Sequence, residues 1–171
     1  MRIEVDKVKA AGTPFAQTYA PDKLVLDEEI GQLTMAAEVS GFASRSGSQI
    51  HLQGDIKTKV RSRCDRCLNP VIVPVDTDFD VIYIPASDDV LDENLELQKD
   101  DLNFSVFEEG TIDLDELVRE QVLLAMPSRL LCREECRGLC PTCGVDLNAD
   151  TCPCGRKEVD PRWSALRDLR F

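Results

Sequence analysis

The sequence contains very little histidine, few aromatic residues and no long apolar stretch. Its 171 residues include a single histidine, His51, and only 5% of them are aromatic. No apolar run approaches the roughly 18 residues that a membrane-spanning helix needs. The first ten residues, MRIEVDKVKA, also lack the continuous apolar stretch of a signal peptide. We therefore expect a cytoplasmic protein without a membrane partner.

Motifs that support catalysis or nucleotide binding are also missing. The sequence has no GxGxxG, P-loop, HExxH or GxSxG pattern. A single histidine leaves little for general acid and base chemistry. We therefore expect a protein that is not an enzyme and that has no small-molecule substrate. A nuclease or another RNA-processing enzyme is the weakest of the functional hypotheses.

Basic side chains are outnumbered, and the imbalance is local. The chain has 20 Lys and Arg against 32 Asp and Glu, a net charge of −12. Residues 76–120 alone hold sixteen acidic and two basic side chains, so the rest of the chain carries +2. An acidic total disfavours indiscriminate nucleic-acid binding. The acidic stretch is interpreted as a solvated loop or, more specifically, as a docking surface for a basic partner such as a ribosomal protein.

One segment carries basic side chains at every second position. Period two places them on one face of a β-strand. The candidate nucleic-acid-binding residues of this stripe and of the turn that follows it are Lys57, Lys59, Arg61, Arg63 and Arg66. The alternative interpretation is a strand face that only improves solubility.

Apolar periodicity predicts an α+β fold with an antiparallel sheet. Strands are expected at residues 50–63 and 71–83, joined as a hairpin by residues 64–70, with a preceding strand at 33–43. Residues 1–9 and 15–19 are expected to extend this sheet, and a short strand is expected around residues 102–106. A helix capped by Asp113 and ending at Pro127 should cover the dry face of the sheet, with Leu124 on its apolar side.

The expected domain organisation is a core with a cysteine-rich appendage. The core comprises residues 1–127 and includes an acidic loop at 86–101. The tail, residues 128–171, is expected to form a zinc knuckle and to end in a short helix packed on the core. Asp160 and Pro161 are a typical start signal for that helix.

All eight cysteines lie in close groups, with spacings typical of tetrahedral thiolate coordination. The preferred partition gives two zinc sites. One is local, and its ligands are Cys140, Cys143, Cys152 and Cys154. The other staples the hairpin to the tail, and its ligands are Cys64, Cys67, Cys132 and Cys136. If only one ion binds, the local site is preferred, and Cys132 and Cys136 can instead complete it with Cys140 and Cys143. Rubredoxin-like iron and disulfide bonds are the alternatives to zinc.

Several motifs from residue 64 onward resemble the YceD family. They are Cys64-Asp-Arg-Cys67-Leu68, Ile112-Asp113-Leu114, Leu124-Ala125-Met126-Pro127, Gly138-Leu139-Cys140-Pro141-Thr142-Cys143-Gly144 with Leu147-Asn148, and Asp160-Pro161-Arg162. The resemblance implies a cytosolic, non-enzymatic factor for large-subunit ribosomal RNA accumulation and processing. Because some family members lack the CPxCG group, it also implies that the tail site is a variable reinforcement.

Two functional hypotheses follow from these observations. The first is an adaptor in large-subunit assembly, whose acidic segment holds a basic ribosomal protein while the basic stripe approaches 23S ribosomal RNA. The second is a redox or metal-sensing module that uses the cysteines between Cys132 and Cys154.

Overall fold

The computed structural model describes residues 1–27, 30–86, 104–154 and 162. Six strands form the main sheet, in the order β2-β4-β5-β6-β7 with β3 also paired to β5. Their bounds are β2 Thr13–Tyr19, β3 Gln32–Leu33, β4 Ala37–Ser46, β5 Gln49–Arg63, β6 Pro70–Pro85 and β7 Phe104–Phe107. Two short strands, β1 Arg2–Glu4 and β8 Thr111–Asp113, pair separately. A 3-10 turn, η1, spans Val5–Lys7, and the helix α1 spans Leu114–Ala125.

The long hairpin of β5 and β6 forms the centre of the sheet. Its antiparallel register runs from Ile50 opposite Tyr83 to Arg63 opposite Pro70. The alternation of the sequence sets the two faces, because every second side chain of a strand points to the same side. Ile56 and Val60 are fully buried, while the lysines and arginines between and beyond them are exposed. Both predicted strands are therefore confirmed, as is the turn between them.

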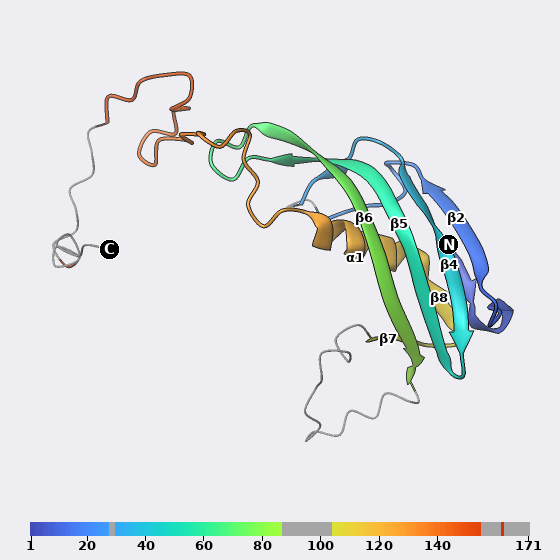
Figure 1. Ribbon diagram of the computed structural model, residues 1–171. Helices are drawn as coiled ribbons and strands as arrows, with labels where there is room; N and C mark the ends of the chain where they lie inside the picture. The colour runs from blue at the N-terminus through green and yellow to red at the C-terminus, as the bar shows by residue number, and fades with distance from the viewer. Residues whose placement is uncertain (28–29, 87–103, 155–161, 163–171) are drawn as a thin grey trace.

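The helix α1 lies across one face of the sheet (Figure 1). Its N-cap Asp113 accepts a hydrogen bond from the backbone N–H of Asp115 at 2.9 Å. Leu117 and Val122 pack in the same core as the inward side chains of β4, β5 and β6. The expectation that a helix covers the dry face is confirmed. Leu124 is a correction: its side chain is 76% exposed, because two residues at 100° each carry it about 200° past the buried Val122.

Three further sheet expectations need correction. The segment 33–43 is two strands, because the chain bends after Leu33; Thr34 still bonds the carbonyl of Lys59 through its N–H at 2.8 Å. Residues 1–9 do not extend the main sheet, since β1 pairs with β8. The sheet is rich in antiparallel pairs but not purely so, because β7 runs parallel to β6. The strand at 15–19 is confirmed within β2, beside β4.

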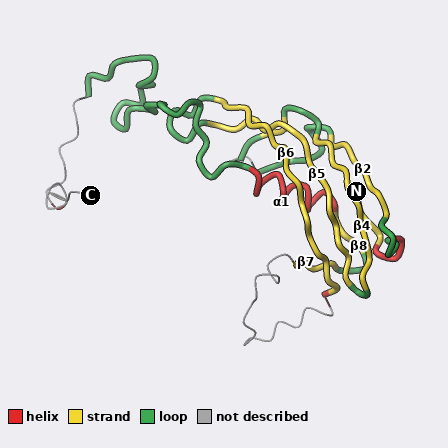
Figure 2. Tube along the Cα trace, viewed as in Figure 1, coloured by secondary structure: helices red, strands yellow, loops and turns green. Residues whose placement is uncertain are grey.

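The cysteine-rich tail begins directly after α1. Residues 127–154 run as loops and turns, and they lie beyond the β5–β6 turn, at the opposite end of the sheet from β7 (Figures 1 and 2). The expected acidic loop, apart from Ala86, and the expected C-terminal helix lie outside the described residues. Within the described ranges, no helix is long and apolar enough to cross a membrane.

Candidate metal centres

The structure brings the eight cysteines together in two groups of four. Within each group, the four sulfur atoms all lie within 4.8 Å of one another. The hairpin cluster consists of Cys64, Cys67, Cys132 and Cys136. The tail cluster consists of Cys140, Cys143, Cys152 and Cys154. This is the preferred partition of the sequence analysis, and the alternative group of Cys132 and Cys136 with Cys140 and Cys143 does not form.

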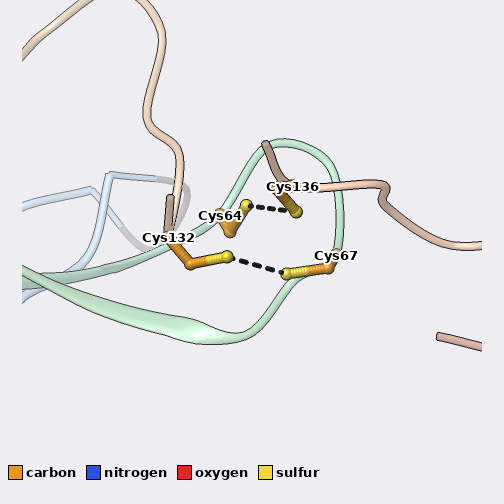
Figure 3. Close-up of side chains that lie close together, drawn as sticks. All are labelled: Cys64, Cys67, Cys132 and Cys136. Atoms are coloured by element: carbon orange, nitrogen blue, oxygen red, sulfur yellow. Dashed lines mark hydrogen bonds between the residues drawn. The ribbon is translucent and has the colours of Figure 1, made fainter. Parts of the chain in front are cut away.

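The hairpin cluster joins two parts of the chain that are far apart in sequence. Two of its sulfurs come from the β5–β6 turn and two from the segment after α1 (Figure 3). The Sγ atoms of Cys64 and Cys136 are 3.8 Å apart, and those of Cys67 and Cys132 are 3.6 Å apart. Val71, Leu131 and Leu139 pack against this cluster, which forms a small core separate from that of the sheet. Three of its four cysteines are buried.

Backbone hydrogen bonds hold the same two segments together. Asp65 donates its N–H to the carbonyl of Leu130 at 2.8 Å and accepts the N–H of Leu130 on its carboxylate at 2.6 Å. Arg66 accepts the N–H of Leu139 on its carbonyl at 3.0 Å and donates from its guanidinium to the carbonyl of Cys136 at 2.6 Å. The turn and the tail are therefore aligned residue by residue beside the four sulfurs.

The tail cluster is local and more open. Its four ligand positions span only residues 140–154, and Cys143 is exposed while Cys152 and Cys154 are half-buried. The Sγ atom of Cys152 lies 3.2 Å from that of Cys140 and 3.5 Å from that of Cys143. The neighbouring N–H of Thr142 points at the sulfur of Cys140 at 3.4 Å. This cluster therefore closes a short loop on itself rather than joining distant segments.

The two clusters perturb their thiols in the same way. Burial raises the pKa of Cys64, but hydrogen bonds from the backbone N–H groups of Cys67, Arg66 and Cys132 outweigh burial and bring the pKa to about 6. The N–H of Cys143 is the main cause that lowers the pKa of Cys140 to about 6. Hydrogen bonds from neighbouring sulfurs raise the pKa of Cys132 and of Cys152 to about 12. Cys64 and Cys140 thus ionise readily, whereas Cys132 and Cys152 need a nearby cation to lose their protons.

The sulfur geometry fits a tetrahedral metal ion. A zinc–sulfur distance of about 2.3 Å places the sulfurs of a tetrahedral site about 3.8 Å apart. The recorded separations of 3.2 to 3.8 Å lie close to that edge length. All eight cysteines are free thiols. Four thiolates leave no open position on the ion, so such a site is structural rather than catalytic.

The side chain of Asn148, which lies within the loop of the tail cluster, contacts a sulfur of the hairpin cluster. Its amide donates to the sulfur of Cys136 at 3.5 Å, and its carbonyl oxygen accepts the N–H of Arg137 at 2.8 Å. Asp146 orients it, by accepting both the backbone N–H and the side-chain amide of Asn148. Sequence reasoning did not single out this role. The signal was present, since Leu147-Asn148 is one of the motifs that carry the family resemblance.

The two knuckle turns share one geometry but not one residue type. The N–H of Leu68 donates to the carbonyl of Cys64 at 2.9 Å, and the N–H of Gly144 donates to that of Cys140 at 2.8 Å. Both residues adopt positive φ, 60° for Leu68 and 76° for Gly144. Glycine adopts this conformation freely, whereas a side chain there costs about 1–2 kcal/mol. The β5–β6 turn beside the hairpin cluster therefore contains a leucine with a strained backbone conformation.

The basic stripe lies on the outer face of β5, next to the hairpin cluster. Lys57, Lys59, Arg61 and Arg63 are all exposed there, between the buried residues of the strand. Lys57 forms an ion pair with Asp76 at 3.7 Å. Arg66 stands apart from the stripe, because its guanidinium bonds the tail. The unpaired part of the stripe, within the described ranges, is thus Lys59, Arg61 and Arg63.

Comparison with protein families decides the affiliation. The model of the family described as large ribosomal RNA subunit accumulation protein YceD matches residues 52–170, which include all eight cysteines. The chain belongs to the YceD family. The predicted resemblance is therefore confirmed, and the family is the one described by accumulation of the large ribosomal RNA subunit.

Individual relatives give a consistent picture. An uncharacterized protein of Mycobacterium tuberculosis is 35% identical over 117 residues, which cover 68% of this chain and 53% of the relative. The chain thus spans about half the length of such relatives. Uncharacterized protein YlbN of Bacillus subtilis is 28% identical, with 91% of this chain and 86% of the relative covered.

A plant relative carries the functional name. The Arabidopsis thaliana protein called large ribosomal RNA subunit accumulation protein YCED homolog 1, chloroplastic, is 27% identical over 155 residues, which cover 78% of this chain and 48% of the relative. No solved structure matches the chain.

Proposed function

We propose that this YceD-family chain is a non-enzymatic factor that promotes accumulation and processing of 23S ribosomal RNA in the cytoplasm. The observation that carries the proposal is the family match over residues 52–170, which spans both cysteine clusters and the stripe from Lys57 to Arg63. The name of the Arabidopsis relative supports the same process. Four-thiolate clusters also suit a binding protein better than an enzyme, since they leave no open coordination position.

In this proposal the chain is an adaptor with two oppositely charged surfaces. The basic stripe contacts ribosomal RNA, and the acidic segment binds a basic ribosomal protein. A cleft of about 580 Å³ supports the acidic side, because its lining includes Glu108, Glu109, Glu116 and Glu120. Burial, followed by the charges of Glu120 and Glu116, raises the pKa of Tyr83 in this cleft to about 12. A strongly negative surface of this kind favours Lys- and Arg-rich partners.

Each cysteine cluster is proposed to hold one structural zinc ion. In the hairpin cluster, Cys64 and Cys67 would bind the ion together with Cys132 and Cys136. The ion would neutralise the thiolates and fix the end of the basic stripe against the tail. The function of zinc in this proposal is therefore to position a binding surface.

Depletion and complementation in the organism of origin test the proposed function. Cells that lack the chain should accumulate less mature 23S than 16S ribosomal RNA, and the wild-type chain should restore the ratio. Pull-down of the tagged chain should recover a large-subunit ribosomal protein or 23S precursor. An unchanged ratio together with no ribosomal component in the pull-down would refute the proposal.

The second candidate is a redox or metal-sensing module. The exposure of Cys143 favours it, because redox-sensing cysteines are accessible to oxidants. On this alternative, mild peroxide oxidises the tail cluster and releases its metal, and the metal-free chain then changes its binding partners. Stoichiometric zinc that survives mild peroxide would exclude it.

A further inference from the structure

Leu68 occupies a position where its local geometry favours glycine. The equivalent residue of the tail knuckle is Gly144, with the same hydrogen bond and a similar positive φ. The leucine side chain is 57% exposed, so burial does not explain it. Strained residues persist where the side chain has a use that outweighs the strain. Leu68 is therefore a candidate contact residue for a partner.

The surroundings of Leu68 form a surface that is apolar and basic. A cleft of about 660 Å³ beside the hairpin turn is lined by Gln32, Arg61, Arg63, Leu68 and Pro70, together with Gly31 and Ser62. Ile72 adjoins it, since it pairs with Arg61 across the two strands and its side chain is 55% exposed on the same outer face. Two exposed aliphatic side chains thus flank two arginines.

The arginines of this cleft lack internal charge compensation. Within the described ranges, neither Arg61 nor Arg63 takes part in an ion pair or a side-chain hydrogen bond, in contrast to Lys57 and Arg66. Arg61 and Arg63 are two residues apart on one strand, so their Cα atoms are separated by about 6.7 Å. This separation resembles that of successive phosphates along a nucleic-acid strand. The charges therefore complement a polyanion with regularly spaced charges.

We infer that the cleft formed by Arg61, Arg63 and Leu68, with Ile72 beside it, binds single-stranded RNA. The two guanidinium groups contact consecutive phosphates, while Leu68 and Ile72 pack against the face of an unstacked base. Base faces are accessible only where RNA is unpaired, because stacking hides them in a duplex. The inference specifies the RNA side of the adaptor and rests on the proposed function for its biological context.

Binding of the zinc-loaded full-length chain to a fluorescent single-stranded RNA oligonucleotide tests the inference. Fluorescence anisotropy measures affinity for the single strand and for a duplex of the same sequence. The wild-type chain should prefer the single strand. Arg61→Gln and Arg63→Gln should each weaken binding. Each should also reduce the slope of log affinity against log salt concentration by about 0.7, as expected for the loss of one phosphate contact.

Leu68→Gly is the decisive variant. It removes the side chain and relieves the strained φ, so its melting temperature should equal or exceed that of the wild-type chain. Its affinity for the single strand should nevertheless fall roughly three- to tenfold, as expected for the loss of one partly buried aliphatic contact. Leu124→Ala is the matched control, because Leu124 is also exposed but lies on the helix. Its affinity should not change.

Three results would overturn the inference. They are unchanged single-strand affinity in Leu68→Gly, equal affinity for the duplex, or loss in Leu68→Gly of an acidic protein partner while RNA binding persists. The proposed function fails separately, on the 23S to 16S ratio and the pull-down. If the chain binds RNA at the cleft but its depletion does not affect large-subunit RNA, the inference stands and only the proposed function is refuted.

Discussion

The hairpin cluster and the tail cluster have the same four thiols but different surroundings. The hairpin cluster joins segments about 65 residues apart in the chain, has apolar neighbours of its own and buries three of its four cysteines. The tail cluster closes a loop within residues 140–154 and buries only one of its four cysteines, Cys140. A metal ion in the first cluster would link two parts of the protein, whereas one in the second would order only a loop.

This difference assigns unequal importance to two similar motifs. Loss of the hairpin cluster would free the tail from the turn that ends the basic stripe. Loss of the tail cluster would leave that junction in place, because the backbone bonds of Asp65 and Arg66 to the tail do not involve it. That the tail site is a variable reinforcement stays a prediction.

The largest expected effect comes from Cys136→Ser. Cys136 is 1% exposed, and its sulfur lies between the sulfur of Cys64 and the amide of Asn148. The variant should lose one metal equivalent, and its free energy of unfolding should fall by about 3 kcal/mol or more. Denaturant unfolding with metal analysis measures both. An unchanged unfolding midpoint with full metal content would contradict the proposed difference between the clusters.

Cys143→Ser is the matched change in the tail cluster. It should also lose one metal equivalent, but its free energy of unfolding should fall by less than about 1 kcal/mol, as is usual for an exposed position. Limited proteolysis should cut within residues 140–154 and leave the junction at Leu130 protected. Destabilisation as large as that of Cys136→Ser would contradict the unequal roles.

Chelation of the wild-type chain should separate the two ions in time. Three of the four cysteines of the hairpin cluster are buried, whereas only Cys140 is buried in the tail cluster, so a chelator should reach the tail cluster faster. Metal release, followed by a coloured chelator, should therefore occur in a fast and a slow phase of equal amplitude. Cys143→Ser should lack the fast phase. A single phase in the wild-type chain would mean that the two sites are equally accessible.

Asn148→Ala should have a smaller effect, confined to metal affinity. The side chain bonds the sulfur of Cys136, and such outer partners typically contribute about tenfold or more to affinity. Competition with a chelator should show that the metal affinity of the slow-release site, the hairpin cluster, falls about tenfold. Asn69→Ala is the control, because it keeps the backbone bonds of Asn69 and removes only a side-chain bond to Asp146, at 3.4 Å, so it should change affinity less than twofold.

Asp115→Asn gives the smallest effect and acts far from both clusters. The N-terminal ammonium is the main cause that lowers the pKa of Asp115, and the hydroxyl of Tyr19 adds to it at 2.7 Å. A carboxylate with a depressed pKa stabilises the fold above its unfolded pKa, and this contribution disappears as pH falls through the folded pKa. The variant should be less stable by up to about 1 kcal/mol at pH 7.

The measurement for Asp115→Asn is thermal unfolding between pH 2 and pH 7, with metal analysis at pH 7. The difference from the wild-type chain should vanish towards the acidic end, while the metal content at pH 7 stays at the wild-type value. A loss of metal would show that the sheet and the clusters are coupled.

The elements predicted from the sequence are those with a local pattern. The alternation of apolar and polar residues predicted β5 and β6. The helix α1 was predicted from its cap at Asp113 and from the spacing of apolar residues such as Leu117 and Val118. The pairing of β1 with β8 and the parallel direction of β7 depend on contacts between distant segments, which periodicity does not encode. Spacing predicted the pairs of cysteines, because a CxxC turn brings two sulfurs together, but it did not fix which pairs share a site.

Other features required the three-dimensional arrangement. The positive φ of Leu68 could not be predicted from its residue type, since leucine, unlike the glycine at position 144, does not favour this conformation. The pairing of Lys57 with Asp76 removes one member from a stripe that looks uniform in sequence. The contact of Asn148 with Cys136 depends on how the tail folds back on the turn.

Native mass spectrometry of the reduced, full-length chain tests the central claim most directly. The account predicts two zinc ions on the wild-type chain and one on each of Cys136→Ser and Cys143→Ser. After brief chelation, the ion that remains on the wild-type chain should be the one that Cys136→Ser lacks. A wild-type chain with no bound metal, or with masses that indicate disulfide bonds in place of metal, would contradict the claim.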